Sequence, residues 1–160
     1  MLEGLLNYLW VFFISMLPIV ELRGGIPAGA LLGLDMIPNY LVSVIGNYLP
    51  VPFILFFIRI VLGWMQKTKW FAGIANWIIA KGEKHADKVT RYATWGLFLF
   101  VAVPFPGTGA WTGALIASLI GMKKRHAFLA ILLGVLTAGV IMSLASYSVV
   151  GAFEFFMPSH

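Results

Sequence analysis

An acidic and a basic residue stand two positions apart in an otherwise apolar part of the chain. Glu21 and Arg23 follow the apolar stretch 5–20. A charge at the centre of a bilayer costs about 2.5–3.5 kcal/mol on insertion scales, so such residues usually line a cavity and have a partner. A desolvated carboxylate beside an arginine can gain and lose a proton, which makes Glu21 our first candidate for an ion-carrying residue. The alternative is a static ion pair that holds a turn in place.

Three residues that disturb regular helices follow this pair: Gly24, Gly25 and Pro27. Side chains two positions apart point in different directions on a regular helix. We therefore expect an irregular backbone at these residues, which lets Glu21 and Arg23 meet. Gly24, Gly25 and Pro27 then belong to the same candidate site for a substrate or ion.

A second distinctive segment, Pro104-Phe105-Pro106-Gly107-Thr108-Gly109, carries no charge. Pro104 and Pro106 lack backbone donors and leave carbonyl groups unpaired, and Gly107 allows close approach to the backbone. A helix that begins near Thr108 would direct its positive end at this loop, which suits an anion. The alternative is a tight turn whose glycines let helices pack closely.

Asn47 is the last candidate binding residue, since it lies within a long apolar segment near Pro50 and Pro52. It either lines the same cavity or hydrogen-bonds across helices. The chain has no cysteine and three scattered histidines, so we expect no disulfide, metal or cofactor. No nucleophile elbow, phosphate loop or pair of catalytic carboxylates occurs, which argues against an enzyme.

The composition requires a membrane environment. Of the 160 residues, 61% are hydrophobic and 11% are charged, whereas about 25% of a soluble domain is charged. A helix needs about 20 apolar residues to span the hydrocarbon layer, and the blocks 39–63 and 126–152 are long enough. We therefore predict a multi-pass protein of the cell (inner or cytoplasmic) membrane.

The apolar segments occur twice in the same order: apolar segment, break, short apolar segment, polar turn, long apolar segment. The short segments, as helices, cover about 15–18 Å, half the hydrocarbon thickness. We predict an all-α integral membrane protein, one membrane domain over 1–160, with two inverted repeats, each a re-entrant helical hairpin plus a transmembrane helix. The predicted parts are a first repeat 1–63, a cytoplasmic amphipathic linker 64–92, a second repeat 93–152 and a tail 153–160.

The hairpins and the linker lead to further expectations. Both hairpin tips should reach the midplane and line one site, which short-range cysteine crosslinking between 23–27 and 105–109 tests. Residues 2–20 form either a hairpin arm or a full span. The linker should form an interfacial helix or pack on the protein's own surface, because five apolar residues share one helical face: Trp70, Phe71, Ile74, Trp77 and Ile78.

The two breaks resemble a known family. ELRGGIPAG at 21–29 and VPFPGTGAWTG at 103–113 are similar to the two signature loops of the putative small multidrug export proteins, which in turn resemble the DedA and VTT-domain membrane proteins. The resemblance covers nearly the whole chain. It implies paired re-entrant hairpins, with Glu21 as the acidic residue of the first. DedA proteins are linked to lipid translocation, including undecaprenyl phosphate recycling, and to the proton-motive force.

The chain departs from the DedA pattern at the second break. DedA proteins carry arginines around the Pro-Gly of that hairpin, whereas this chain has uncharged residues there: Val103, Phe105, Thr108 and Trp111. A lipid phosphate would therefore depend on Arg23, on helix ends or on Arg59.

Three functions fit these features. The first is a proton-coupled transporter that moves a small amphipathic or anionic solute through a midplane site between the two hairpins. The second is a lipid flippase or scramblase for polyprenyl or phospholipid phosphates, and the third is a membrane scaffold without transport activity. The expected partners are the lipid bilayer, a small solute or lipid, and a second copy of the chain in a homodimer. No nucleic acid is expected, because the basic clusters flank membrane segments.

The charge distribution predicts the topology. Nine of the eleven lysines and arginines fall in 67–91 and 123–125, and cytoplasmic loops carry such an excess, so both termini should be extracytoplasmic. In the cysteine-free chain of intact cells, Ser159→Cys should react with a membrane-impermeant maleimide and Thr68→Cys should not. Labelling of Thr68→Cys from outside would contradict this topology.

Overall fold

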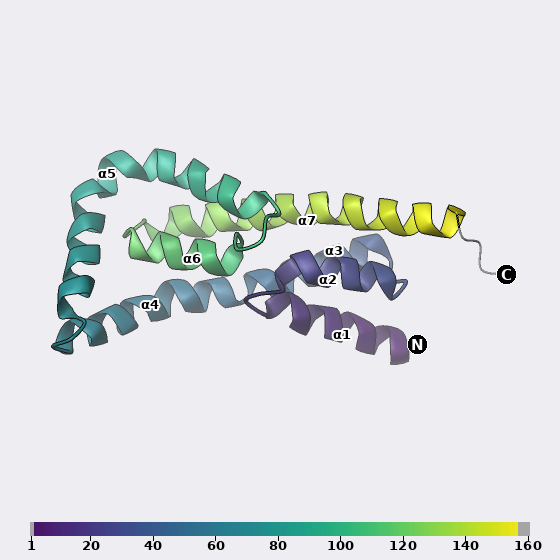
Figure 1. Cartoon of the computed structure of the whole chain (residues 1–160), viewed down its shortest axis with the longest axis horizontal. Helices are drawn as coiled ribbons and strands as arrows, with labels where there is room; N and C mark the ends of the chain where they lie inside the picture. The colour runs from purple at the N-terminus through teal and green to yellow at the C-terminus, as the bar shows by residue number, and fades with distance from the viewer. Residues whose placement is uncertain (1, 157–160) are drawn as a thin grey trace. The chain divides into compact units, whose positions relative to one another are not determined.

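The protein is all-α over the residues that the computed structural model describes, which are the backbone of 2–156 without the side chains of 2, 78–79 and 81–91 (Figure 1). This described part holds seven helices and no strand: α1 (Leu2–Met16), α2 (Glu21–Leu31), α3 (Met36–Tyr48), α4 (Pro50–Lys67), α5 (Ala72–Ala102), α6 (Ala110–Leu119) and α7 (Lys124–Phe156). The all-helical prediction is confirmed.

The contacts divide the chain into two compact units. The first, which we call the terminal unit, combines the residues up to Leu49 with those from Val135 onward, and the second, the central unit, is Pro50–Gly134. The terminal unit thus contains α1, α2, α3 and most of α7, and the central unit contains α4, α5, α6 and the first turns of α7. Each unit is described separately below.

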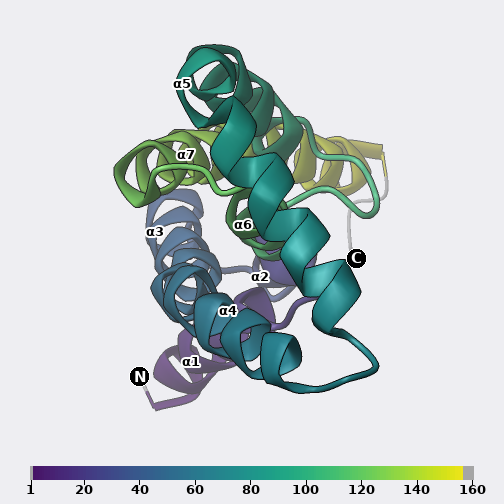
Figure 2. The ribbon, with the colours of Figure 1, turned by 90° about the vertical axis from the view of Figure 1, so that its left-hand side faces the viewer.

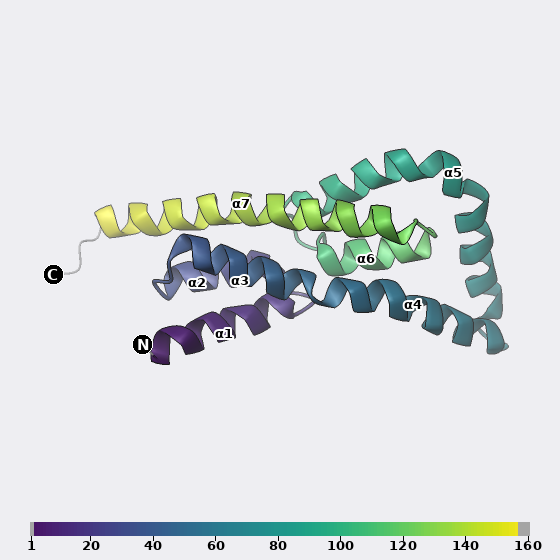
Figure 3. The same cartoon turned by 180° about the vertical axis from the view of Figure 1, so that it is seen from behind.

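Glycines set the packing of α1, α2 and α3 in the terminal unit. A side chain at Gly46 of α3 would meet the backbone carbonyl oxygen of Phe12 in α1, and one at Gly25 of α2 would meet the Ser15 hydroxyl. The helices can therefore approach to backbone contact, as small residues allow in membrane bundles. Figure 3 shows that α1 and α3 run in the same direction and that α2, which connects the end of α1 to the start of α3, runs in the opposite direction.

Glycines play the same part in the central unit, where the contacts are apolar. Gly113 of α6 faces Val101 and Leu97 of α5, and Gly134, in the third turn of α7, also faces Val101. Val101 is accordingly buried, with 1% of its surface exposed. Figure 2 shows α4 followed by the turn and the first part of α5 in this unit.

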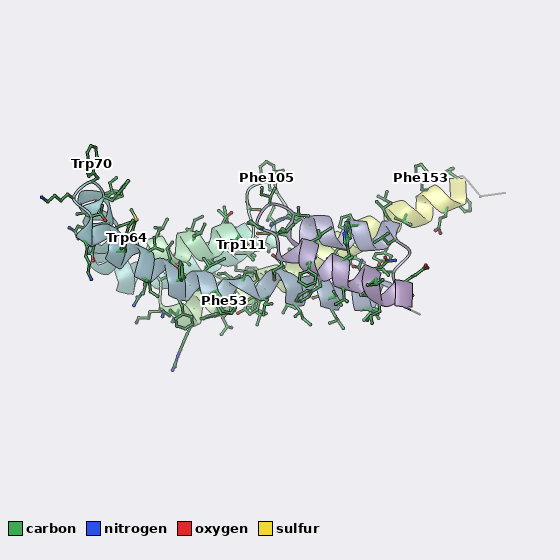
Figure 4. All side chains as sticks on the ribbon, turned by 90° about the horizontal axis from the view of Figure 1, so that it is seen from below. Phe53, Trp64, Trp70, Phe105, Trp111 and Phe153 are labelled. Carbon is green, nitrogen blue, oxygen red and sulfur yellow. The ribbon has the colours of Figure 1, made fainter. Side chains whose placement is uncertain are left out.

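Two stretches are long and apolar enough to cross a membrane: Met36–Lys67, with 32 residues, and Lys124–Phe156, with 33. Large apolar side chains cover the outside of these helices, and Figure 4 shows Phe53 and Trp64 of α4 projecting from the ribbon, with 69% and 66% of their surfaces exposed, and Trp70 in the turn after α4, with 90% exposed. A soluble monomer rarely exposes large contiguous apolar patches. This outward apolar surface fits lipid as the solvent.

The long segments extend beyond their expected ends, and the first one is interrupted. The segment expected at 40–63 is two helices, α3 and α4, with a turn at Leu49. Pro50 begins α4, where its missing N–H costs nothing, because the first amides of a helix have no partner within that helix. Asn47 therefore lies in the last turn of α3, not in the middle of an unbroken helix.

The linker is not a helix of its own. The turn after α4 covers residues 68–71, and α5 then continues without a break from Ala72 through the expected boundary at 92 to Ala102. Trp70 and Phe71 precede α5, so they do not share its face as predicted. Ile74 and Trp77 are exposed on α5, and the side chain of Ile78 lies outside the described residues.

The glycine contacts of α7 lead to a paired prediction. Gly134→Ala should lower the free energy of unfolding by about 1–3 kcal/mol, because overpacking forces neighbours to move and the added carbon would lie 2.7 Å from Val101 Cβ. Gly151→Ala, on the same helix, has no atom within 4 Å of the added carbon and should be neutral or slightly stabilising. Thermal unfolding in detergent measures both variants, and equal losses would contradict the packing described here.

Candidate functional site

An ion pair between the buried Glu21 and the half-buried Arg23 at the start of α2 is the chemically strongest feature of the terminal unit. Arg23 Nη1 donates to Glu21 Oε2 at 2.8 Å, and the side chains of the two residues are 17% and 4% exposed. Hydrogen bonds between ionised groups are stronger than neutral ones. Removing Arg23 would leave Glu21 as an uncompensated buried charge, a change that typically costs about 3–5 kcal/mol. The structure therefore confirms that these two candidates meet.

The pair forms because the chain turns sharply just before Glu21. Helix α1 ends at Met16 and residues 17–20 form a turn, within which Pro18 has no amide to donate. The Glu21 amide donates to the Leu17 carbonyl oxygen at 3.0 Å. Glu21 itself has a positive φ of 52°. It is the only non-glycine residue with a positive φ in the described part of the chain. This left-handed conformation is strained for a side chain with a Cβ, and such strain gathers at functional sites.

The sequence prediction placed the irregular backbone at the wrong residues. Gly24, Gly25 and Pro27 all lie inside helix α2, and the break is at 17–20, directly before the left-handed Glu21. The left-handed backbone at Glu21, not the glycines, lets side chains at i and i+2 meet. Gly25 instead serves helix packing, since it lies against Ser15 of α1.

Helix α3 contributes a row of buried polar side chains. Asn39, Ser43 and Asn47 recur every fourth residue, which places them on one face, and each is at most 1% exposed. Asn39 Nδ2 lies 2.9 Å from the Ile26 carbonyl oxygen of α2 and 3.0 Å from the Tyr147 hydroxyl of α7. The spacing Asn-xxx-Ser-xxx-Asn is visible in the sequence. The prediction named only Asn47, from its place in an apolar segment near two prolines, and missed Asn39 and Ser43.

Tyrosine hydroxyls attach the second half of α7 to this row. Tyr147 donates to the Leu34 carbonyl oxygen at 2.6 Å and Tyr40 of α3 donates to the Leu136 carbonyl oxygen at 3.2 Å. Sequence reasoning missed both tyrosines. Their hydroxyls satisfy carbonyl groups inside an apolar unit, where an unpaired polar group is expensive.

The second break lies in the central unit and largely satisfies its own polar groups. The Thr108 hydroxyl is 2.9 Å from the carbonyl oxygens of Val103 and Phe105, and the Phe105 amide donates to the Val103 carbonyl oxygen at 2.8 Å. These two carbonyls are therefore engaged inside the loop, contrary to the expectation that the prolines leave them available. Gly107, with φ 86°, makes the turn. Helix α6 begins at Ala110 with Gly109 as its N-cap residue, two positions later than predicted.

The candidates thus fall into two groups by unit. The candidates of the terminal unit are Glu21, Arg23, Gly24, Gly25 and Pro27 of α2 and Asn47 of α3. Those of the central unit are Pro104, Pro106, Gly107 and Thr108, in the loop before α6. Among the described residues no cluster of three or more His, Cys, Asp or Glu side chains could hold a metal ion.

Two helices long and apolar enough to cross a membrane, an outward apolar surface and an ion pair within an apolar unit are typical of a small helical membrane protein. The sequence profile of one family, described as putative small multi-drug export protein, matches residues 21–141, from the ion pair to the middle of α7. The chain belongs to this family, whose name indicates export across a membrane and not an enzymatic reaction. Comparisons with curated proteins and with solved structures give no match.

The left-handed backbone at Glu21 can be tested by a pair of substitutions. Glu21→Gly and Glu21→Ala both remove the carboxylate and leave Arg23 in the same situation, so they differ only in how well they tolerate φ 52°. The glycine variant should be more stable by about 1 kcal/mol, because a Cβ in this conformation costs about 1–2 kcal/mol and glycine's extra unfolded-state freedom offsets part of this. Thermal unfolding in detergent compares the two; an alanine variant as stable as the glycine variant would show that Glu21 is not left-handed.

Proposed function

We propose that the protein is a proton-coupled transporter that moves a small amphipathic or anionic solute across the membrane, with Glu21 as the proton carrier. The observation that carries this proposal is the buried pair of Glu21 and Arg23 at 2.8 Å, at the start of a short helix beside a turn. Ionisable residues inside membrane segments usually mark ion or substrate pathways. The family's export name supports the same class of function.

The pair offers a direct mechanism of coupling. A proton and Arg23 compete for the Glu21 carboxylate, so protonation releases the guanidinium, which can then bind an anionic group of the solute. For such a solute, proton binding and solute binding reinforce each other. A solute with a positive group would instead compete with the proton for Glu21, and the two would be exchanged. The sign of the coupling therefore reports the charge of the solute.

The proposal includes the predicted membrane arrangement. Helices α2 and α6 have 11 and 10 residues, or about 15–17 Å at 1.5 Å per residue, which is half of the hydrocarbon thickness. We propose that each is one arm of a re-entrant hairpin, that the two hairpin-plus-helix repeats are inverted, and that the termini are extracytoplasmic. Broken helices that end near the midplane are the usual construction of sites in secondary transporters.

Three variants test the role of Glu21. Glu21→Gln keeps shape and hydrogen bonding but cannot titrate, so it should fold and should lose pH-gradient-driven flux. Arg23→Gln should be the least stable variant, because it leaves Glu21 as an uncompensated buried charge unless that group takes up a proton. The double variant should recover stability but not flux. The measurements are thermal stability in detergent and pH-driven flux in proteoliposomes.

The outcomes separate the proposed function from the alternatives. Full pH-driven flux in well-folded Glu21→Gln would end the proton-carrier proposal. If Glu21 is only a structural partner of Arg23, Glu21→Gln should itself destabilise and flux should fall in step with folded protein. A scramblase would equilibrate labelled lipid in the same liposomes without any gradient, and a scaffold would show neither activity.

A further inference from the structure

A polar seam runs between α3 and the two helices that precede it. We define the polar seam as Asn39, Ser43 and Asn47 of α3 together with Ser15 of α1, all at most 1% exposed. The three residues of α3 extend over about 12 Å of that helix. Ser15 lies against Gly25, which is one helical turn beyond Glu21 on α2. The seam therefore ends close to the ion pair.

Two members of the polar seam each have a buried oxygen atom without a hydrogen-bond partner. Ser15 Oγ and Asn47 Oδ1 have no partner within the described residues, and neither has Ser143 Oγ of α7. Ser143 lies four residues from both Gly139, which faces Tyr40 of α3, and Tyr147, which bonds to Asn39, so it shares the α7 face that packs on α3. Native proteins leave few buried polar groups unpaired, and each one needs a cause.

Two of the contacts that close the seam have a glycine on one side. Gly46 of α3 lies against the carbonyl oxygen of Phe12, and Gly29 of α2 lies against the side chain of Asn39. At its other end the seam reaches the Tyr147 hydroxyl and the Leu34 carbonyl, next to the exposed Asp35. Because α1 and α3 run in the same direction (Figure 3), Ser15 and Asn47 both lie just beyond the Phe12–Gly46 contact.

We propose that the polar seam opens into an aqueous pathway between Asp35 and Glu21, and that this structure holds the pathway closed. Opening would hydrate the oxygen atoms of Ser15, Asn47 and Ser143, which closure leaves unpaired. Apolar side chains at these positions would gain nothing from contact with water. The role of the pathway, access of water and protons to the carboxylate, rests on the proposed function, but its existence does not.

Cysteine reactivity tests the pathway directly, since the chain has no native cysteine. Ser15→Cys and Asn47→Cys in proteoliposomes should react with a small charged methanethiosulfonate, present on both sides, at least about tenfold faster than Val11→Cys and Val44→Cys. The two valines are matched controls, because they lie on the same helices and are 0% and 7% exposed. A tenfold ratio corresponds to about 1.4 kcal/mol in the cost of exposing the site.

A second substitution shifts the seam toward opening. Gly46→Ala would place a carbon against the Phe12 carbonyl oxygen, which is backbone and cannot swing aside, whereas Gly4→Ala on α1 has no atom within 4 Å. Gly46→Ala should therefore raise the labelling rate of Asn47→Cys several-fold, and Gly4→Ala should leave it unchanged. If Gly46→Ala does not fold, Gly29→Ala, which meets the side chain of Asn39, replaces it.

The outcomes are independent of transport. Slow labelling of both the seam cysteines and the valine controls, in every background, would overturn the pathway. Fast labelling at all of these positions would also overturn it, because it would show that the whole unit opens to solvent. Faster labelling of the seam alone supports it. The proposed function fails on a different measurement, undiminished pH-driven flux in Glu21→Gln, so either can fail while the other stands.

Discussion

The constraint on which the terminal unit depends is that Glu21 must have a partner when it is buried. An ionised carboxylate in an apolar setting is tolerated only when it is paired and hydrogen-bonded. The chain meets this demand with Arg23, at 2.8 Å, two residues along. A regular helix would keep these side chains apart, so the turn at 17–20 and the left-handed backbone of Glu21 are both needed to bring them together. The strain at Glu21 is thus a consequence of pairing within one short segment.

The contacts around this pair differ in kind from those of the central unit. Gly134 and Gly113 lie against Val101, and Gly113 also lies against Leu97. These contacts of the central unit are apolar, so opening them would expose no polar atom that lacks a partner. In the terminal unit, Gly25 lies against the Ser15 side chain and Gly29 against the Asn39 side chain. Gly46 lies against the backbone carbonyl of Phe12. Closure in the terminal unit therefore covers polar atoms, some of which it leaves without partners. In lipid, helix association comes from close packing and polar contacts, and the proposed opening therefore concerns the terminal unit.

The fold class and the candidate pair could be predicted from the sequence, but the backbone that produces the pair could not. Composition and segment length were sufficient for an all-α chain with two long apolar helices, and charges in an apolar stretch were sufficient for Glu21 and Arg23. The break was placed at Gly24–Pro27 because glycine and proline disturb helices. The proline that lies in the break is Pro18, near the end of the apolar stretch 5–20, whereas Pro27 lies inside α2 without ending it. The linker was separated from α5 because its composition changes at 92, although composition carries no signal that ends a helix. Tyr147 and Asn39, 108 residues apart, could not be paired from a single sequence.

The two breaks have similar positions in the order of segments but different chemistry, and this restricts where coupling can occur. The break at 103–109 has no charged residue and engages the carbonyls of Val103 and Phe105 with its own Thr108. Of the six acidic residues in the chain, Glu3, Asp35 and Glu154 lie at segment ends, and Glu83 and Asp87 lie in the basic linker. The sixth, Glu21, follows an apolar stretch and is buried against a cation. A proton that is coupled to transport through a carboxylate in the apolar part of this chain must therefore bind at Glu21, and a repeat in sequence order does not require a repeat of function.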